Sequence, residues 1–155
     1  MIVLDREKRL TLRALGYWRG ISRDRRFPRC DDVDPSALGD DWLNCIVLKL
    51  AMPLGESRFI HVGRNLCFPP GTVLRERPLS EVPQQSVLHA ATSYVSRVLE
   101  KQVPFGIDGF TVHGDGFALY RSILMPLSDS GDTIDAIFGA ANFREAPMRE
   151  EEFPA

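Results

Sequence analysis

Residues 17–38 read YWRGISRDRRFPRCDDVDPSAL, and this stretch holds the strongest local structural signals in the chain. Its first two residues, an aromatic pair, close a segment whose apolar side chains recur at helical spacing. Pro28 stops that helix from continuing, because proline has no backbone N–H. Asp34 then suits a helix N-cap, with Pro35 at the first helical position. The stretch predicts a helix, a basic turn and a short second helix.

Upstream, the sequence predicts a helix over Asp5–Gly20. Its apolar side chains form one stripe, made of Leu4, Leu12, Leu15 and Trp18 and widened by Leu10, Ala14, Tyr17 and Ile21. Such a face has to be buried, because water disfavours contact with apolar surface. Either the sheet of the same chain or a second chain covers it, and the sequence leaves both alternatives open.

Downstream, turn residues separate segments of high β-propensity. The predicted strands are Leu43–Ala51, Ser57–Gly63, Phe105–His113, Phe117–Leu127 and Thr133–Phe143. One long helix is expected over Gln84–Val103, whose apolar residues fall on one face. A hairpin and a meander separated by helices predict an α+β domain with one antiparallel sheet.

Two motifs carry a resemblance to a bacterial PAS-like sensor family. Members of that family open with an aromatic-ended helix, a basic RRxP turn and an acidic D-x-DP segment. This chain has similar residues in the same order: Tyr17-Trp18, then Arg25-Arg26-Phe27-Pro28-Arg29, then Asp31 and Asp34-Pro35. A later LPL…G…VD hairpin of the family resembles Leu124-Met125-Pro126-Leu127, Gly131 and Ile134-Asp135. The resemblance covers about residues 17–143 in ordered pieces.

The resemblance implies a five-stranded antiparallel sheet in which the first strand is central, beside the last. It also implies helices on one face of the sheet and an N-terminal helix before the domain. We therefore expect an N-terminal helix over residues 1–22, a PAS-like domain over residues 23–143 and a flexible acidic tail over residues 144–155.

A PAS sheet and its helices enclose a space that is either a ligand cavity or a filled core. We expect Arg58, Arg121 and Asp135 to face water. Because successive side chains of a strand point to opposite faces, the residues next to these three should face inward. This places Ile134, Ala136 and Phe138 on the inner face. The candidate ligand-cavity residues are Phe59, His61, Leu88, Ala91, Tyr94 and Tyr120. The alternative is a filled core in which each polar group meets a backbone partner.

The sequence assigns no cofactor and no metal site. Its three cysteines and three histidines show no metal-ligand spacing. Cys67 lies where flavin-binding PAS domains carry a reactive cysteine, but the residues around it do not resemble that motif. Nucleophile-elbow, phosphate-loop and H-E-x-x-H motifs are absent, so we do not expect an enzyme.

Composition describes an ordinary globular chain. Its 155 residues fit one domain, with 44% hydrophobic and 26% charged residues. The net charge of −2 disfavours nucleic acid as a partner. No apolar run is long enough for a membrane span, and the start of the chain does not resemble a signal peptide, so a cytoplasmic location is expected.

The resemblance implies a stand-alone signalling or sensory module that acts through a small-molecule ligand, a signalling protein partner, or both. A homodimer is expected, with Leu12, Leu15 and Trp18 as candidate interface residues. Two alternatives stay open: a small-molecule-processing enzyme on a PAS-like scaffold, and a structural interaction domain without a ligand.

Overall fold

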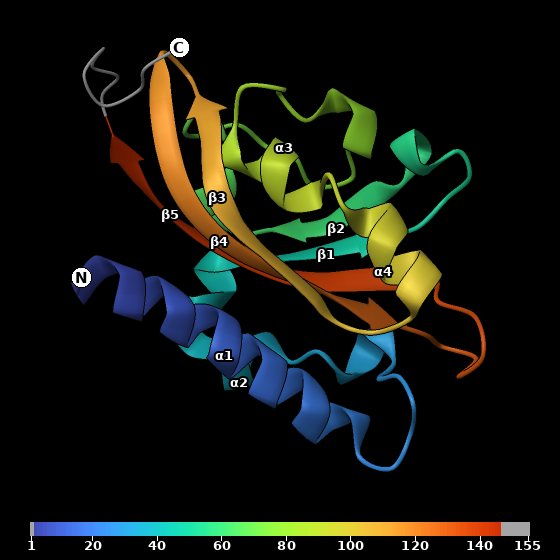
Figure 1. The fold of residues 1–155 in the computed structure, drawn as a ribbon. Helices are drawn as coiled ribbons and strands as arrows, with labels where there is room; N and C mark the ends of the chain where they lie inside the picture. Colours follow the sequence, from blue (N-terminus) through green and yellow to red (C-terminus); the bar gives the residue numbers. More distant parts are fainter. Residues whose placement is uncertain (1, 147–155) are drawn as a thin grey trace.

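The computed structural model describes residues 2–146, with side chains from Arg9 onward (Figure 1). The Leu4 side chain and residues 147–155, most of the predicted tail, lie outside this range. The helices are α1 (Ile2–Ser22), α2 (Pro35–Leu38), α3 (Val87–Thr92) and α4 (Val95–Lys101). The strands are β1 (Cys45–Lys49), β2 (Arg58–Val62), β3 (Phe105–His113), β4 (Gly116–Leu127) and β5 (Ala136–Ala146).

The strands form one antiparallel sheet in the order β2-β1-β5-β4-β3. This confirms the expected five-stranded sheet and the pairing of the first strand with the last, while the middle strand of the five is β5 and not the first strand. β5 continues to Ala146 and so includes the first residues of the segment expected as a tail. The backbone of residues 76–79 covers the outer edge of β2, where Phe59 N–H donates to the Arg77 carbonyl at 3.1 Å.

The prediction of one helix over Gln84–Val103 is wrong, because α3 and α4 are separated at Ser93 and Tyr94. The hydroxyls of Thr92 and Ser93 donate to the carbonyls of Leu88 and Ala90, at 2.8 and 2.7 Å. These bonds compete with the helical N–H donors for the same carbonyl oxygens. The chain therefore bends, and Tyr94 at the bend is buried.

Helices lie on both sides of the sheet (Figure 1). α3 and α4 cover one face, where Leu48, Leu124 and Ile137 are buried among their side chains. α1 crosses the other face over β4 and β5. Its residues Leu10, Ala14 and Trp18 share a buried cluster with sheet residues Val47, Ile123, Met125, Leu127, Ala136, Phe138 and Ala140.

The expectation that Ala136 and Phe138 face α3 and α4 is therefore wrong. β5 begins at Ala136, so Ile134 and Asp135 belong to the preceding connection and do not set the strand's alternation. Within the strand, Ile137 faces α3 and α4, which places its neighbours under α1. Ile134 itself is half-buried and packs against both clusters at the end of the sheet.

The stretch that opens the sequence analysis fastens α1 to the domain. The Tyr17 hydroxyl donates to the Asp32 carbonyl at 3.2 Å and accepts from the Asp34 N–H at 2.7 Å. Asp34 caps α2 through the Ser36 N–H at 3.0 Å, as predicted. Asp32 accepts from Arg25 Nη2 at 2.6 Å, so the basic turn and the acidic segment pair with each other.

Candidate functional site

The space between the sheet and the helices α3 and α4 is filled by side chains. Phe59, Leu88, Ala91 and Tyr94 lie together in one buried cluster, and none of the four is more than 3% exposed. Tyr120 is buried beside them on the same side, in a smaller cluster with Val87 and Ala118. The structure therefore brings these predicted cavity residues together, and they form a packed core.

His61 does not join them, and the expectation that it faces the same space is wrong. Val47 pairs with His61 but Leu48 pairs with Phe59, so Ile60 is an extra residue that forms a β-bulge. The bulge puts Phe59 and His61 on opposite faces of the sheet. Because strand alternation assumes no bulge, sequence reasoning missed this reversal.

On its own face, the His61 ring stacks on the ring of Trp42, with centroids 3.7 Å apart. Its Nε2 lies 3.0 Å from the Trp42 carbonyl oxygen. Burial lowers the pKa of His61, and the bond to that carbonyl partly opposes the shift. A surface depression of about 440 Å³ adjoins the stacked rings of His61 and Trp42, and Cys30 and Arg75 border it.

The polar groups inside the core satisfy one another. Ser122 Oγ donates to the Ile107 carbonyl at 3.1 Å and lies 2.6 Å from the Tyr94 hydroxyl. Since the serine has a single proton and donates it to the carbonyl, the tyrosine is the donor in the shorter bond. Burial raises the pKa of Tyr94, which keeps this phenol protonated. The interior therefore offers no free polar group at Tyr94.

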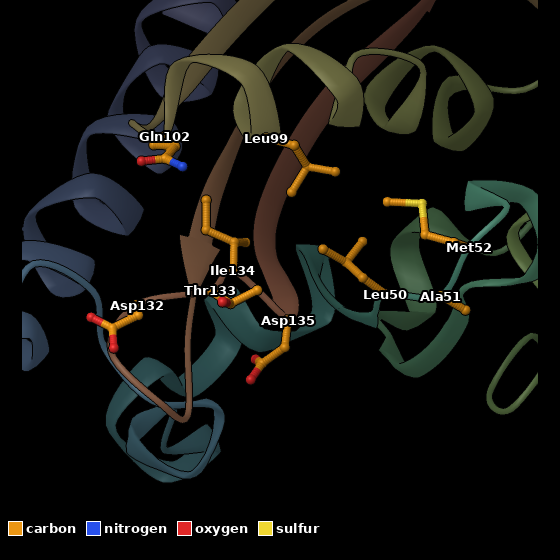
Figure 2. A pocket seen from close by; sticks show the side chains of 9 residues that line it. All are labelled: Leu50, Ala51, Met52, Leu99, Gln102, Asp132, Thr133, Ile134 and Asp135. Atoms are coloured by element: carbon orange, nitrogen blue, oxygen red, sulfur yellow. The ribbon is translucent and has the colours of Figure 1, made fainter.

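An open cleft of about 460 Å³ lies at the end of this core (Figure 2). Three segments form it: the residues that directly follow β1, the end of α4, and the connection between β4 and β5. Its lining residues are Leu50, Ala51, Met52, Leu99, Gln102, Asp132, Thr133, Ile134 and Asp135. The volume lies in the range of small-molecule sites.

The floor of the cleft is apolar and continuous with the core. Leu50, Leu99 and Ile134 pack against the buried cluster and also line the cleft. Figure 2 shows Leu99 reaching down from α4 toward the space above Ile134. These residues were predicted as strand or helix positions but not as a site, because only the tertiary fold brings the three segment ends together.

Backbone and side-chain hydrogen bonds hold the walls of the cleft in place. Leu50 N–H donates to the Asp135 carbonyl at 3.0 Å, which joins two of the three segments. Gln102 ends α4 in the left-handed region at φ 59°, and its side-chain oxygen accepts from Arg26 at 2.6 Å. One carboxylate oxygen of Asp135 accepts from the Asp129 N–H at 3.0 Å, which fixes that side chain.

The charges on the lining residues are those of two carboxylates, Asp132 and Asp135. Asp132 is exposed, while Asp135 is half-buried. An apolar floor with a negative rim is suited to a small ligand that has an apolar body and a positive group. Cys67 is not among the lining residues, and burial raises the pKa of its thiol.

Within residues 2–146 we find no group of three or more His, Cys, Asp or Glu side chains that could hold a metal ion. The same described residues include no helix long and apolar enough to cross a membrane.

Comparison with known proteins gives one family and several solved structures of similar shape. The light state of the Aureochrome1 LOV photoreceptor is 15% identical, with a TM-score of 0.44, over 71% of this chain and 90% of that chain. The LOV domain of the Erythrobacter litoralis EL346 blue-light activated histidine kinase is 11% identical, with a TM-score of 0.45, over 66% and 96%. A PAS domain from Colwellia psychrerythraea is 17% identical, with a TM-score of 0.43, over 74% and 96%.

A search of curated proteins found no match. The family comparison is decisive, because the PAS domain family matches residues 6–142, which is most of the chain. The matched region includes most of α1, all five strands up to the later part of β5, and every segment of the cleft. The chain belongs to the PAS domain family.

Proposed function

We propose that this PAS domain is a sensory module that binds a small ligand with an apolar body and a positive group in the cleft. The observation that carries the proposal is the continuity of the cleft's apolar floor with the packed core. A ligand on Leu99 would contact α4, and a ligand on Leu50 and Ile134 would contact the segments that directly follow β1 and precede β5. Binding would therefore bias the position of α4 relative to the sheet.

The module acts by binding and not by turnover. Among the described residues that line the cleft there is no histidine, cysteine or lysine, which supports a binding role for this site. The fixed carboxylate of Asp135 already accepts a backbone N–H. An enzyme on this scaffold, or an interaction domain without a ligand, would each predict a different result in the following titration.

Tryptamine and indole-3-acetate are suitable probes, because they share an aromatic ring and carry opposite charges at neutral pH. We expect tryptamine to bind roughly tenfold more tightly, as measured by calorimetry at low salt. The variant Asp132→Asn should weaken tryptamine binding severalfold and leave indole-3-acetate unchanged. Asp115→Asn is the matched control, because Asp115 does not line the cleft. Equal affinities for both probes, or no binding, would contradict the proposal, and conversion of tryptamine would favour the enzyme.

A homodimer is the second part of the proposal, with the outward side of α1 as the contact surface. Leu12 is 57% exposed, and with the half-buried Leu15 it lines a groove of about 140 Å³ beside β3. The groove also holds Asp108 and Arg121, an ion pair with a 3.3 Å separation. A surface that carries a negative residue, Asp108, and a positive residue, Arg121, beside the apolar Leu12 favours a self-complementary contact with a second copy of the chain.

Trp18 does not belong to this proposed interface, which corrects the expectation from sequence. Its side chain is buried on the chain's own sheet and is 8% exposed. Sedimentation velocity of the intact protein and of Leu12→Asp tests the dimer. A native dimer that becomes a folded monomer in Leu12→Asp supports the proposal. A native monomer, or a Leu12→Asp dimer, contradicts it.

A cytoplasmic location, a protein partner in signalling and the absence of nucleic-acid binding complete the proposal. The net charge of −2 supports the last of these. In the basic turn, Arg25 is paired with Asp32 and Arg26 with Gln102, so two of its arginines are already engaged within the chain.

A further inference from the structure

His113, the last residue of β3, joins the sheet to the start of α3. Its side chain is 7% exposed. The ring lies between those of Phe68 and Phe143, with centroids 4.4 and 4.8 Å away. The imidazole is therefore held by aromatic walls and has little freedom to turn.

The two ring nitrogens of His113 have different partners. Nδ1 accepts the backbone N–H of Val87, the first residue of α3, at 3.1 Å. A nitrogen that accepts carries no proton, so the proton of the neutral ring is on Nε2. Nε2 faces the carboxylate of Glu145 on β5 at 3.5 Å. Next to this bond, Gly114 N–H donates to the Gln85 carbonyl at 2.9 Å.

We propose that His113 is a pH-sensitive latch: protonation of Nδ1 breaks its bond to Val87 and releases the first turn of α3 from the β3–β4 hairpin. A protonated Nδ1 is a donor, and it would face the N–H of Val87, which is also a donor. The two groups cannot form a hydrogen bond. The imidazolium keeps the Glu145 carboxylate on β5 as its partner. Protonation therefore strengthens the attraction between His113 and Glu145 while the hydrogen bond between His113 and the Val87 N–H of α3 is lost.

The groups around the His113 ring have opposite effects on its protonation. Glu145 on β5 favours the charged imidazole, and Asp115 in the β3–β4 turn lines one depression together with His113 and Glu145. From the segment after β2 and from β5 come the apolar rings of Phe68 and Phe143, and from α3 comes the Val87 amide. Burial lowers the pKa of His113, and Glu145 opposes this in part. The latch is therefore closed at neutral pH and opens as the pH falls.

Release would loosen a buried part of the helix layer. Val87 is 1% exposed and shares its cluster with Ala118 and Tyr120. Movement of the first turn of α3 therefore loosens the cover over this end of β4. This inference concerns α3 and does not depend on any ligand in the cleft, so either proposal can fail without the other.

Amide hydrogen exchange of Val87, measured by NMR on the full chain between pH 7.5 and 5, tests the latch. After correction for intrinsic exchange, we expect protection of Val87 to fall at least about fivefold, the effect of losing one hydrogen bond. The midpoint should coincide with the titration of the His113 ring in the same sample. Glu145→Gln should move both midpoints to lower pH together, and it leaves the fold intact because Glu145 is 71% exposed.

His113→Asn is the matched variant, because the asparagine carbonyl occupies nearly the place of Nδ1 and does not titrate. Its Val87 protection should not depend on pH. His89→Asn, an exposed position on α3, should behave as the native chain. Three outcomes would overturn the latch: Val87 protection that is constant while His113 titrates, a Val87 midpoint that Glu145→Gln leaves in place, and a His113 ring that stays neutral until the protein unfolds. None of the three needs a His113 variant, so the test stands even if His113→Asn does not fold.

Discussion

The indole Nε1 of Trp18 donates a hydrogen bond to the carbonyl oxygen of Pro126 at 2.8 Å. Pro126 lies on β4 opposite Ile137, beyond the pairing with β3, whose first residue Phe105 lies opposite Leu124. This part of β4 therefore has no neighbouring strand on its β3 side. A proline, which has no backbone N–H, is tolerated there because no strand requires a donor at this position. The helix supplies the donor that a neighbouring strand would have supplied. This bond links the N-terminal motif to the later LPL hairpin.

Trp18→Ala should lower the free energy of unfolding by about 3–5 kcal/mol, because it leaves a cavity between α1 and the sheet. Trp18→Phe should cost less, because it keeps most of the ring but leaves the Pro126 carbonyl without this donor. Urea denaturation measures both. Val73→Ala is the control, since Val73 is 74% exposed and its truncation should change stability by less than about 0.5 kcal/mol. A Trp18→Ala protein as stable as the control would show that α1 does not pack on this sheet.

Tyr17→Phe should destabilise the protein by about 1–2 kcal/mol, because one hydroxyl serves both the Asp32 carbonyl and the Asp34 N–H. The ring remains, so packing against Phe138, at a centroid distance of 6.0 Å, is kept. Thermal unfolding monitored by circular dichroism is the measurement. No loss of stability would mean that the motif's tyrosine does not fasten α1 to the acidic segment.

The pair Tyr94 and Ser122 should respond asymmetrically to substitution. Ser122→Ala leaves the buried Tyr94 hydroxyl without its acceptor and should cost about 1–3 kcal/mol. Tyr94→Phe removes that hydroxyl itself, and Ser122 still donates to the Ile107 carbonyl, so it should cost about 1 kcal/mol or less. Denaturant titrations of both variants decide the order. The reverse order would contradict the assignment of the tyrosine as donor.

Stability should depend on pH through His61. Its folded-state pKa is lowered by burial, so the unfolded chain binds the proton more readily. The His61 contribution is fully present above the unfolded pKa of about 6.5 and decreases as the pH falls below it toward the folded pKa. His61→Phe keeps an aromatic ring against Trp42 and should flatten this part of the profile. A profile between pH 7.5 and 5 as steep as that of the native protein would exclude this role for His61.

The fold was predictable because its local signals agree with one another. The apolar run of β1, the turn residues between strands and the Asp34-Pro35 cap each specify one local structure, and a single antiparallel sheet satisfies all of them. The break between α3 and α4 at Ser93 and Tyr94 was not predictable, because it depends on which carbonyl the hydroxyls of Thr92 and Ser93 meet.

The candidate site was predicted less well than the fold. The position of His61 depends on a single extra residue, Ile60, which no periodic pattern reveals. The cleft arises where segment ends that carry Leu50, Leu99 and Ile134 meet, and these residues are far apart in the sequence. Ile134 was expected to face inward and Leu99 to lie on the apolar face of the long helix, but their meeting with Leu50 in one site follows from the tertiary arrangement.

The central claim is that the cleft, and not the filled interior beneath Tyr94, receives a ligand. Intermolecular nuclear Overhauser effects between tryptamine and the methyl groups of the protein test it most directly. We predict contacts from the indole ring to the methyls of Leu50, Leu99 and Ile134, and none to Leu88 or Ala91, which are buried in the core. Contacts to Leu88 and Ala91 without contacts to Leu99 and Ile134 would place the ligand inside the core and contradict the account.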